Sequence, residues 1–231
     1  MHNVVVVNNL KKTYSNKIAL RDVSFQMPKG RVLGILGPNG SGKTTLIKIL
    51  AGITHQENGE VMIEGKAPGK ETKAMVAYLA DRNTMYNSFS IREAINMFKS
   101  FYDNFNEDKA EELLKFMKLN PEDKVGTLSK GMKEKLHLLL VLSRDAKLYI
   151  LDEPIAGVDP VARDQILDAI INSISQDSTL LITTHLVRDM ERIFDDVIFI
   201  SDGSFILTGE ADSLRLEKNM SIDELYKAIF S

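Results

Sequence analysis

Nine consecutive residues carry the clearest chemical pattern in the chain: Gly37, Pro38, Asn39, Gly40, Ser41, Gly42, Lys43, Thr44 and Thr45. They fit G-x-x-x-x-G-K-[ST], in which glycines let successive backbone N–H groups point at a phosphate. A strand-like run precedes them at 31–36 and a helical pattern follows at 45–51, whose positive end would face the same concavity. Lys43 can reach the β- and γ-phosphates, and the Thr44 hydroxyl can bind the accompanying Mg²⁺. The segment predicts a nucleoside triphosphate site.

Two carboxylates follow a buried-strand pattern at 148–151, namely Asp152 and Glu153. Beside a phosphate loop, one carboxylate can hold magnesium through water, and its neighbour can orient or deprotonate an attacking water. The alternative is a plain solvated strand end. His185 follows a second such strand at 180–183 and could hydrogen-bond a γ-phosphate, although a lone histidine there is more often structural.

Two further features could take part in nucleotide binding, but each also has a purely structural explanation. Ser129 is a good N-cap for a helix that runs to Leu142, and Gly131 in its first turn would let a ligand approach the backbone closely. Tyr14 precedes the phosphate loop, where its ring could stack on a nucleotide base or fill a core. The residues alone leave both alternatives open.

The remaining patterns predict an α/β chain that could position these groups. Apolar spacing of three and four residues between 90 and 117 predicts two amphipathic helices. Short apolar runs and turn residues predict strands at 4–7, 18–20, 23–27, 60–63 and 74–79, and a hairpin over 197–208. Further helices are expected at 161–174 and 221–230.

Composition limits the kinds of partner. The chain has 231 residues, with 29 Lys and Arg against 32 Asp and Glu, so no nucleic acid is expected. It has no cysteine, hence no disulfide or thiolate metal site. The sequence begins without the pattern of a signal peptide, and its longest nearly apolar run, 136–142, is far below the ~20 residues that span a bilayer. Any membrane-spanning part is expected in another chain.

The order and spacing of these motifs over residues 3–210 resemble the nucleotide-binding subunit of ATP-binding cassette (ABC) transporters. The resemblance implies a P-loop NTPase fold: an α/β, RecA-like core with a mixed sheet, an N-terminal antiparallel β lobe and an inserted α-helical lobe. It implies one domain over 1–231, divided into a β lobe at 1–80, a helical lobe at about 86–147, resumed core at 148–210 and a C-terminal helix at 211–231.

The same resemblance implies a role for each motif and a set of partners. It assigns Tyr14 to adenine stacking, Gly37 through Thr45 to the phosphates and magnesium, Asp152 to the metal, Glu153 and Lys43 to catalysis, and His185 to the γ-phosphate. It implies that Ser129 and Gly131 face the ATP of a second, head-to-tail subunit, and that Asp159 helps couple the two sites. ATP and Mg²⁺ are the expected cofactors. An integral membrane permease is the expected partner, and through it the chain is expected to be cytoplasmic and peripheral on the inner face of the cell membrane.

The sequence departs from the family pattern in two places. Lys130 and Met132 replace the first glycine and the glutamine of the usual Leu-Ser-Gly-Gly-Gln signature, a form more like that of exporter-type subunits. Asp81 stands where the family usually has a glutamine that touches magnesium, and no glutamine occurs from 57 to 164. Asp81 is expected to contact the metal through a bridging water; the alternative is a bystander that raises the pKa of neighbouring carboxylates.

These observations favour an ATPase subunit that powers a separate membrane transporter. The alternatives are a soluble ABC ATPase acting on a non-membrane partner and a non-catalytic module gated by nucleotide. Six of the chain's 16 aromatic residues fall between Tyr86 and Phe105, which predicts a docking surface for the membrane partner, unless the rings simply fill a core.

Overall fold

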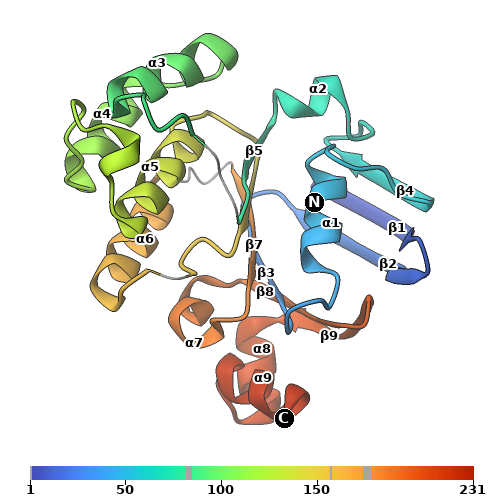
Figure 1. Cartoon of the computed structure of the whole chain (residues 1–231). Helices are drawn as coiled ribbons and strands as arrows, with labels where there is room; N and C mark the ends of the chain where they lie inside the picture. Colours follow the sequence, from blue (N-terminus) through green and yellow to red (C-terminus); the bar gives the residue numbers. More distant parts are fainter. Residues whose placement is uncertain (1, 82–84, 157, 174–177) are drawn as a thin grey trace.

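The computed structural model describes residues 2–81, 85–156, 158–173 and 178–231. Two β-sheets and a set of surrounding helices form the mixed α/β architecture shown in Figure 1. The predicted fold class, an α/β chain with a mixed sheet and an antiparallel N-terminal sheet, is confirmed.

The smaller sheet is antiparallel, in the order β2-β1-β4. Its strands are β1 (Asn3–Tyr14), β2 (Lys17–Pro28) and β4 (Asn58–Ile63). The short strands expected at 4–7, 18–20 and 23–27 are parts of the two 12-residue strands β1 and β2. Register shifts absorb the polar residues between the apolar runs; Asn9 has φ 50° at one of them.

The larger sheet has the order β5-β6-β7-β3-β8-β9, parallel except for β9. Its strands are β3 (Val32–Leu36), β5 (Val76–Leu79), β6 (Leu148–Asp152), β7 (Thr179–Thr184), β8 (Asp196–Ser201) and β9 (Ser204–Glu210). Because β3, β6 and β7 are adjacent and parallel, their carboxyl ends meet at one edge of the sheet. The β lobe expected at 1–80 is therefore not a single sheet. Residues 1–80 contain the small sheet and also β3 and β5, which belong to the larger sheet.

Helices surround the larger sheet, and α3 to α6 gather on one side of it in Figure 1. Their bounds are α1 (Lys43–Leu50), α2 (Lys70–Lys73), α3 (Ile91–Phe101), α4 (Glu107–Phe116), α5 (Lys130–Leu142), α6 (Pro160–Ser173) and α7 (Val187–Met190), with 3-10 turns η1 (Val125–Thr127) and η2 (Glu191–Ile193). The two amphipathic helices expected between 90 and 117 are therefore α3 and α4. The end expected for α6, at residue 174, lies outside the described residues.

The single helix expected over 211–231 is wrong, because this segment forms two helices, α8 (Ala211–Lys218) and α9 (Ile222–Phe230). The second of them confirms the helix expected at 221–230. Asn219 ends α8 in the left-handed conformation, with φ 52°. The Ser221 hydroxyl then accepts a hydrogen bond from the Glu224 N–H at 3.1 Å and starts α9. The residue that ends α8, Asn219, and the residue that caps α9, Ser221, thus lie two positions apart.

Apolar side chains from α1 fix the phosphate loop to both sheets. Leu46, Ile47, Ile49 and Leu50 are fully buried, in one cluster with side chains from the small sheet and from β3, β6 and β7. Burying a side chain of this size stabilises the fold by about 1.5–3 kcal/mol. The helix that begins the predicted nucleotide site is therefore firmly anchored.

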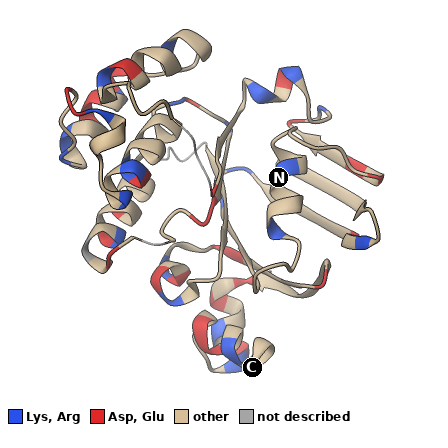
Figure 2. Cartoon of the chain, viewed as in Figure 1, with Lys and Arg blue, Asp and Glu red and all other residues tan. Residues whose placement is uncertain are grey.

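The helices carry basic and acidic side chains interspersed with one another, as Figure 2 shows. Over the residues that the structure describes, no helix is both long enough and apolar enough to cross a bilayer.

Replacing Ser90 should destabilise α3. Its hydroxyl accepts from the Glu93 N–H at 3.1 Å, and the Glu93 carboxylate accepts from the Ser90 N–H at 2.6 Å, which closes a capping box. We expect Ser90→Ala to lower the free energy of unfolding by about 1 kcal/mol in denaturant titrations. Ser100→Ala, an exposed serine on the same helix, is the control; equal effects of the two variants would contradict the capping role.

Candidate active site

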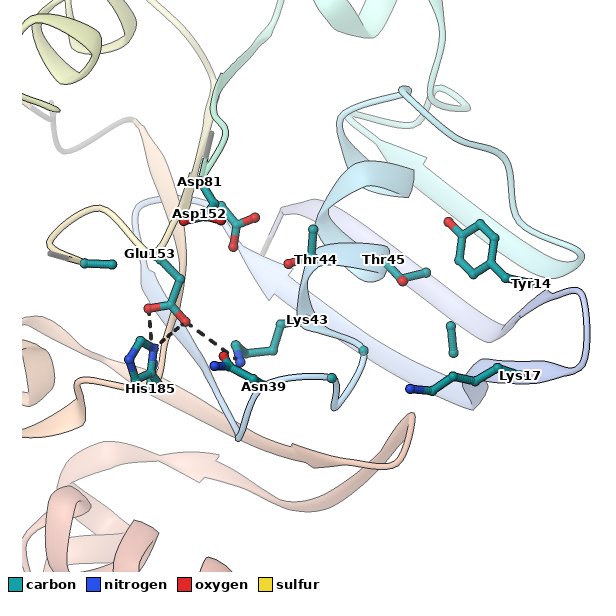
Figure 3. Close-up of a pocket in the computed structure, with 14 residues that line it drawn as sticks. Tyr14, Lys17, Asn39, Lys43, Thr44, Thr45, Asp81, Asp152, Glu153 and His185 are labelled. Atoms are coloured by element: carbon teal, nitrogen blue, oxygen red, sulfur yellow. Dashed lines mark hydrogen bonds and ion pairs between the residues drawn. The ribbon is translucent and has the colours of Figure 1, made fainter. Parts of the chain in front are cut away.

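A cavity of about 400 Å³ lies where the phosphate loop meets the carboxyl ends of β6 and β7 (Figure 3). Its lining residues are Tyr14, Lys17, Ala19, Asn39, Gly40, Gly42, Lys43, Thr44, Thr45, Asp81, Asp152, Glu153, Ala156 and His185. The cavity thus brings together side chains from the β1–β2 hairpin, the phosphate loop, the segment after β5 and two strand ends.

The phosphate loop can hold its shape only with glycine at two positions. Gly42 has φ 113°, and a Cβ there would lie 2.5 Å from the Ala19 carbonyl oxygen. A Cβ on Gly37 would lie 2.3 Å from the Ile200 carbonyl oxygen. Because both obstacles are backbone atoms, a side chain could be accommodated only by moving a strand or hairpin. The tight loop lets α1 begin at Lys43, so the N-terminus of this helix faces the cavity.

The Lys43 ammonium lies at the centre of the site. It donates to the carbonyl oxygens of Gly37 at 2.7 Å and Pro38 at 3.1 Å, and lies 3.9 Å from Glu153 Oε1. Burial lowers the pKa of Lys43, while the charges of Glu153 and Asp152 act in the opposite direction. With two of its three donors directed at loop carbonyls, the ammonium keeps a donor for a phosphate oxygen.

Asp152 ends β6 and is almost completely buried. Its Oδ1 accepts from the Thr183 hydroxyl at 2.5 Å, whereas the buried Oδ2 has no hydrogen-bond partner within the described part of the chain. Burial raises the pKa of Asp152, the hydrogen bond from Thr183 acts in the opposite direction, and the nearby charges of Glu153 and Asp81 raise the pKa again. A buried carboxylate oxygen without a partner is costly unless a ligand satisfies it, which suits a metal-binding role.

Glu153 turns sharply away from the strand and directs its side chain into the cavity. Its backbone has φ 50°, uncommon for a residue with a Cβ, and its N–H donates to the Thr183 carbonyl at 3.0 Å. Glu153 Oε1 lies 2.9 Å from His185 Nδ1, and Oε2 accepts from the His185 backbone N–H at 3.3 Å. Figure 3 shows these contacts and the Lys43 ion pair as dashed lines. The carboxylate is held where it can accept a proton from water.

Some predicted site residues lie outside the cavity lining. Gly37, Pro38 and Ser41 belong to the phosphate loop but do not line the cavity, and the buried Ser41 hydroxyl has no partner among the described residues. Ser129 and Gly131 lie at the start of α5, where Gly131 faces Asp159: a Cβ on this glycine would be 3.9 Å from Asp159 Oδ2.

Tyr14 is not a core residue, since 45% of its surface is exposed and its ring lines the cavity. Lys12 Nζ lies 5.0 Å from the ring centroid. The ring is therefore a partly solvent-exposed part of the cavity lining. The alternative of a core tyrosine is therefore wrong.

Sequence reasoning missed three residues of the lining: Lys17, Ala19 and Ala156. The hairpin pairs Lys17 with Tyr14 across adjacent strands, and so carries both side chains to the cavity. A lysine and two alanines in turn or strand patterns give no chemical signal, so only the tertiary structure could identify them.

The fold and this cavity define a P-loop nucleoside triphosphatase. The family model described as ABC transporter matches residues 20–156. The chain is 32% identical to a Nod factor export ATP-binding protein of Burkholderia lata over 94% of this chain and 75% of that protein. It is 31% identical to the lantibiotic transport ATP-binding protein SrtF of Streptococcus pyogenes over 89% of this chain and 90% of that protein.

A solved structure, that of the ATP-binding subunit of an ABC transporter, superposes with a TM-score of 0.87 at 27% identity and covers 98% of this chain and 99% of its own. The chain belongs to the ABC transporter family, as one of its ATP-binding and ATP-hydrolysing subunits. ATP hydrolysis by such a subunit energises transport.

Glu153→Gln should retain ATP binding but lose turnover, because the amide keeps the shape of the side chain and cannot accept a proton from water. We expect kcat to fall by about 10²- to 10⁴-fold, with the Kd for ATP nearly unchanged. Glu57→Gln, an exposed glutamate, is the matched control. Normal hydrolysis by Glu153→Gln would show that another group is the base.

Proposed function

We propose that the chain is the ATPase subunit of an exporter-type transporter, paired head to tail with a second ATPase subunit and attached to a separate permease at the inner face of the cell membrane. One observation carries this proposal. The cavity gathers the phosphate loop, Asp152, Glu153 and His185, but the capped N-terminus of α5 at Ser129 and Gly131 is not in its lining. A second subunit in head-to-tail arrangement would bring that anion-binding end over the open nucleotide.

Mg²⁺ fits the residues of this site. The unpartnered Oδ2 of Asp152 and the hydroxyl of Thr44 are the hard oxygen donors that this ion prefers. The described residues contain no group of three or more His, Asp or Glu side chains arranged for a metal. Mg²⁺ is usually held by one or two carboxylates together with substrate phosphates and water. Bound there, the ion would neutralise charge on the phosphate oxygens.

The chain's own residues then divide the work of hydrolysis. Lys43 binds the phosphates, Glu153 accepts the proton of the attacking water, and His185, held beside Glu153, donates to the γ-phosphate. Tyr14 offers its exposed face to the adenine. Lys17, at the same wall, adds a positive charge near the nucleotide.

The aromatic-rich segment at 86–105 supports docking to the permease. Two of its rings are largely exposed, Tyr86 at 68% and Phe101 at 73%, while Phe89, Phe98 and Phe105 pack against the core. Aromatic residues are enriched at protein–protein interfaces relative to the rest of the surface. The prediction that the segment presents aromatic surface therefore applies to two rings and not to all six.

A second cavity lies beside this segment. It has about 230 Å³ and is lined by Tyr78, Met85, Met97, Phe98, Tyr102, His137, Val141 and Arg144. The Tyr78 hydroxyl and both His137 ring nitrogens are buried without hydrogen-bond partners in the described chain, and burial lowers the pKa of His137 to about 4. Neutral groups of this kind suit a polar, uncharged side chain of the permease. Burial raises the pKa of Tyr78, and the charges of Asp152 and Asp81 add to this effect.

The names of the relatives favour export over the alternatives. Both are ATP-binding proteins of named export or transport systems, which supports a membrane partner rather than a soluble one. The direction of transport rests on this similarity and on Lys130 and Met132 in the signature segment.

Removing the exposed rings should detach the subunit from its permease. We expect Tyr86→Ala with Phe101→Ala to weaken membrane association at least about tenfold, since aromatic anchors carry much of an interface's binding energy. The measurement is the affinity of the purified subunit for membranes that contain its permease. Leu216→Ala, which removes an 84% exposed side chain on α8, is the control. Unchanged affinity of the double variant would overturn this docking surface.

Asp81→Asn separates the two possible roles of Asp81, because they predict opposite effects. If Asp81 supports Mg²⁺ through a water, losing its charge should raise the Mg²⁺ concentration needed for ATP binding by about tenfold. If Asp81 is only a like-charge neighbour, its loss should lower the pKa of Asp152 and preserve Mg²⁺-dependent binding to lower pH. We expect the first result, read from Mg²⁺ titrations of ATP binding at several pH values.

A further inference from the structure

Arg163, on the first turn of α6, connects two segments that flank the active site. Its Nε donates to the Val158 carbonyl at 2.9 Å, and its Nη1 donates to Asp189 Oδ2 at 2.6 Å. Asp189 belongs to α7, which begins two residues after His185. Arg163 is not part of the nucleotide cavity. Its guanidinium therefore joins the turn after Glu153 to the segment after His185, without facing the nucleotide.

Both connected segments touch functional groups. On one side, Val158 and Asp159 lie against the start of α5, where a Cβ on Gly131 would be 4.0 Å from Val158 Cγ1. Asp159 also caps α6, since its Oδ1 accepts from the Ala162 N–H at 3.1 Å. On the other side, His185 contacts both carboxylate oxygens of Glu153.

The bridge that Arg163 forms between Val158 and Asp189 depends on the planar, forked guanidinium of arginine. Two donors of one planar group, Nε and Nη1, reach a backbone carbonyl and a carboxylate that belong to different elements. The Arg163 and Asp189 side chains are 26% and 35% exposed, so the pair is partly shielded from solvent. Arg192 provides a contrast at the same junction: its Nη2 lies 3.8 Å from the carboxylates of Asp164 and Asp168, and its side chain is 55% exposed.

We infer that Arg163 is a positioning residue that couples the two ATP sites of the paired subunits, through its joint hold on Val158 and Asp189. A shift in the Val158–Asp159 segment moves the surroundings of Gly131, which in the proposed pairing faces the partner's ATP. Through Arg163 the same shift reaches His185 and Glu153, which act on the subunit's own ATP. This inference rests on the proposed head-to-tail pairing. ATP binding by a single subunit is independent of Arg163.

The test compares three variants that remove different parts of the bridge. Arg163→Gln loses both contacts, Asp189→Asn loses the charge pair, and Arg163→Lys keeps a charge but cannot reach both partners with one compact ammonium. We expect kcat to fall about tenfold or more in Arg163→Gln and less in the other two, because small displacements of catalytic groups are costly. The Kd for ATP of the isolated subunit and the melting temperature should stay close to those of the unchanged chain.

Cooperativity supplies a readout that a merely structural role would not change. In Arg163→Gln, the Hill coefficient for ATP should fall toward that of independent sites, whereas Arg192→Gln, the matched control, should leave kcat and cooperativity unchanged. Wild-type kcat and Hill coefficient in Arg163→Gln, or full activity in Arg163→Lys, would overturn the inference. Failure of the pairing itself is seen separately, as activity of the unchanged chain that does not depend on protein concentration.

Discussion

The structure depends on burying opposite charges together at one edge of a parallel sheet. Lys43 and Asp152 are both shielded from water, and burial lowers the pKa of the lysine while it raises that of the aspartate. Each group is thus biased toward its neutral form, and the attraction between them opposes that bias. The close packing of α1 against both sheets holds the phosphate loop in place beside these charges.

A local departure from regular geometry places the proposed general base. Glu153 has a left-handed backbone, and a strained residue persists only when its surroundings fix it. Here the parallel pairing of β6 with β7 supplies the support, because Glu153 follows the last residue of β6 and its N–H continues the pairing to Thr183. The adjacent strand ends at Thr184, so His185 lies beside the carboxylate.

Two regions connect this site to the rest of the molecule. Tyr78 lies on the strand before Asp81; its hydroxyl faces a small cavity beside the aromatic-rich helix α3, and its pKa responds to the carboxylates of the nucleotide site. On the other side, Val158 and Asp159 adjoin the start of α5 and are tied through Arg163 to α7. In the function proposed above, these two regions would lie between the nucleotide site and the docking surface, and between the nucleotide site and a facing subunit.

The sequence by itself determined the phosphate loop, the carboxylate pair, the capped helix at Ser129 and the α/β class, because each depends on local spacing, apolar periodicity or turn chemistry. It could not find Lys17 or Arg163, whose residue types are ordinary on a solvated surface and acquire a role only from the elements that meet around them. It also gave no means to choose between a core and a cavity for Tyr14, or to see two helices after 210. Strand order, register and the approach of distant segments decided those points, since they depend on contacts between residues far apart in the chain.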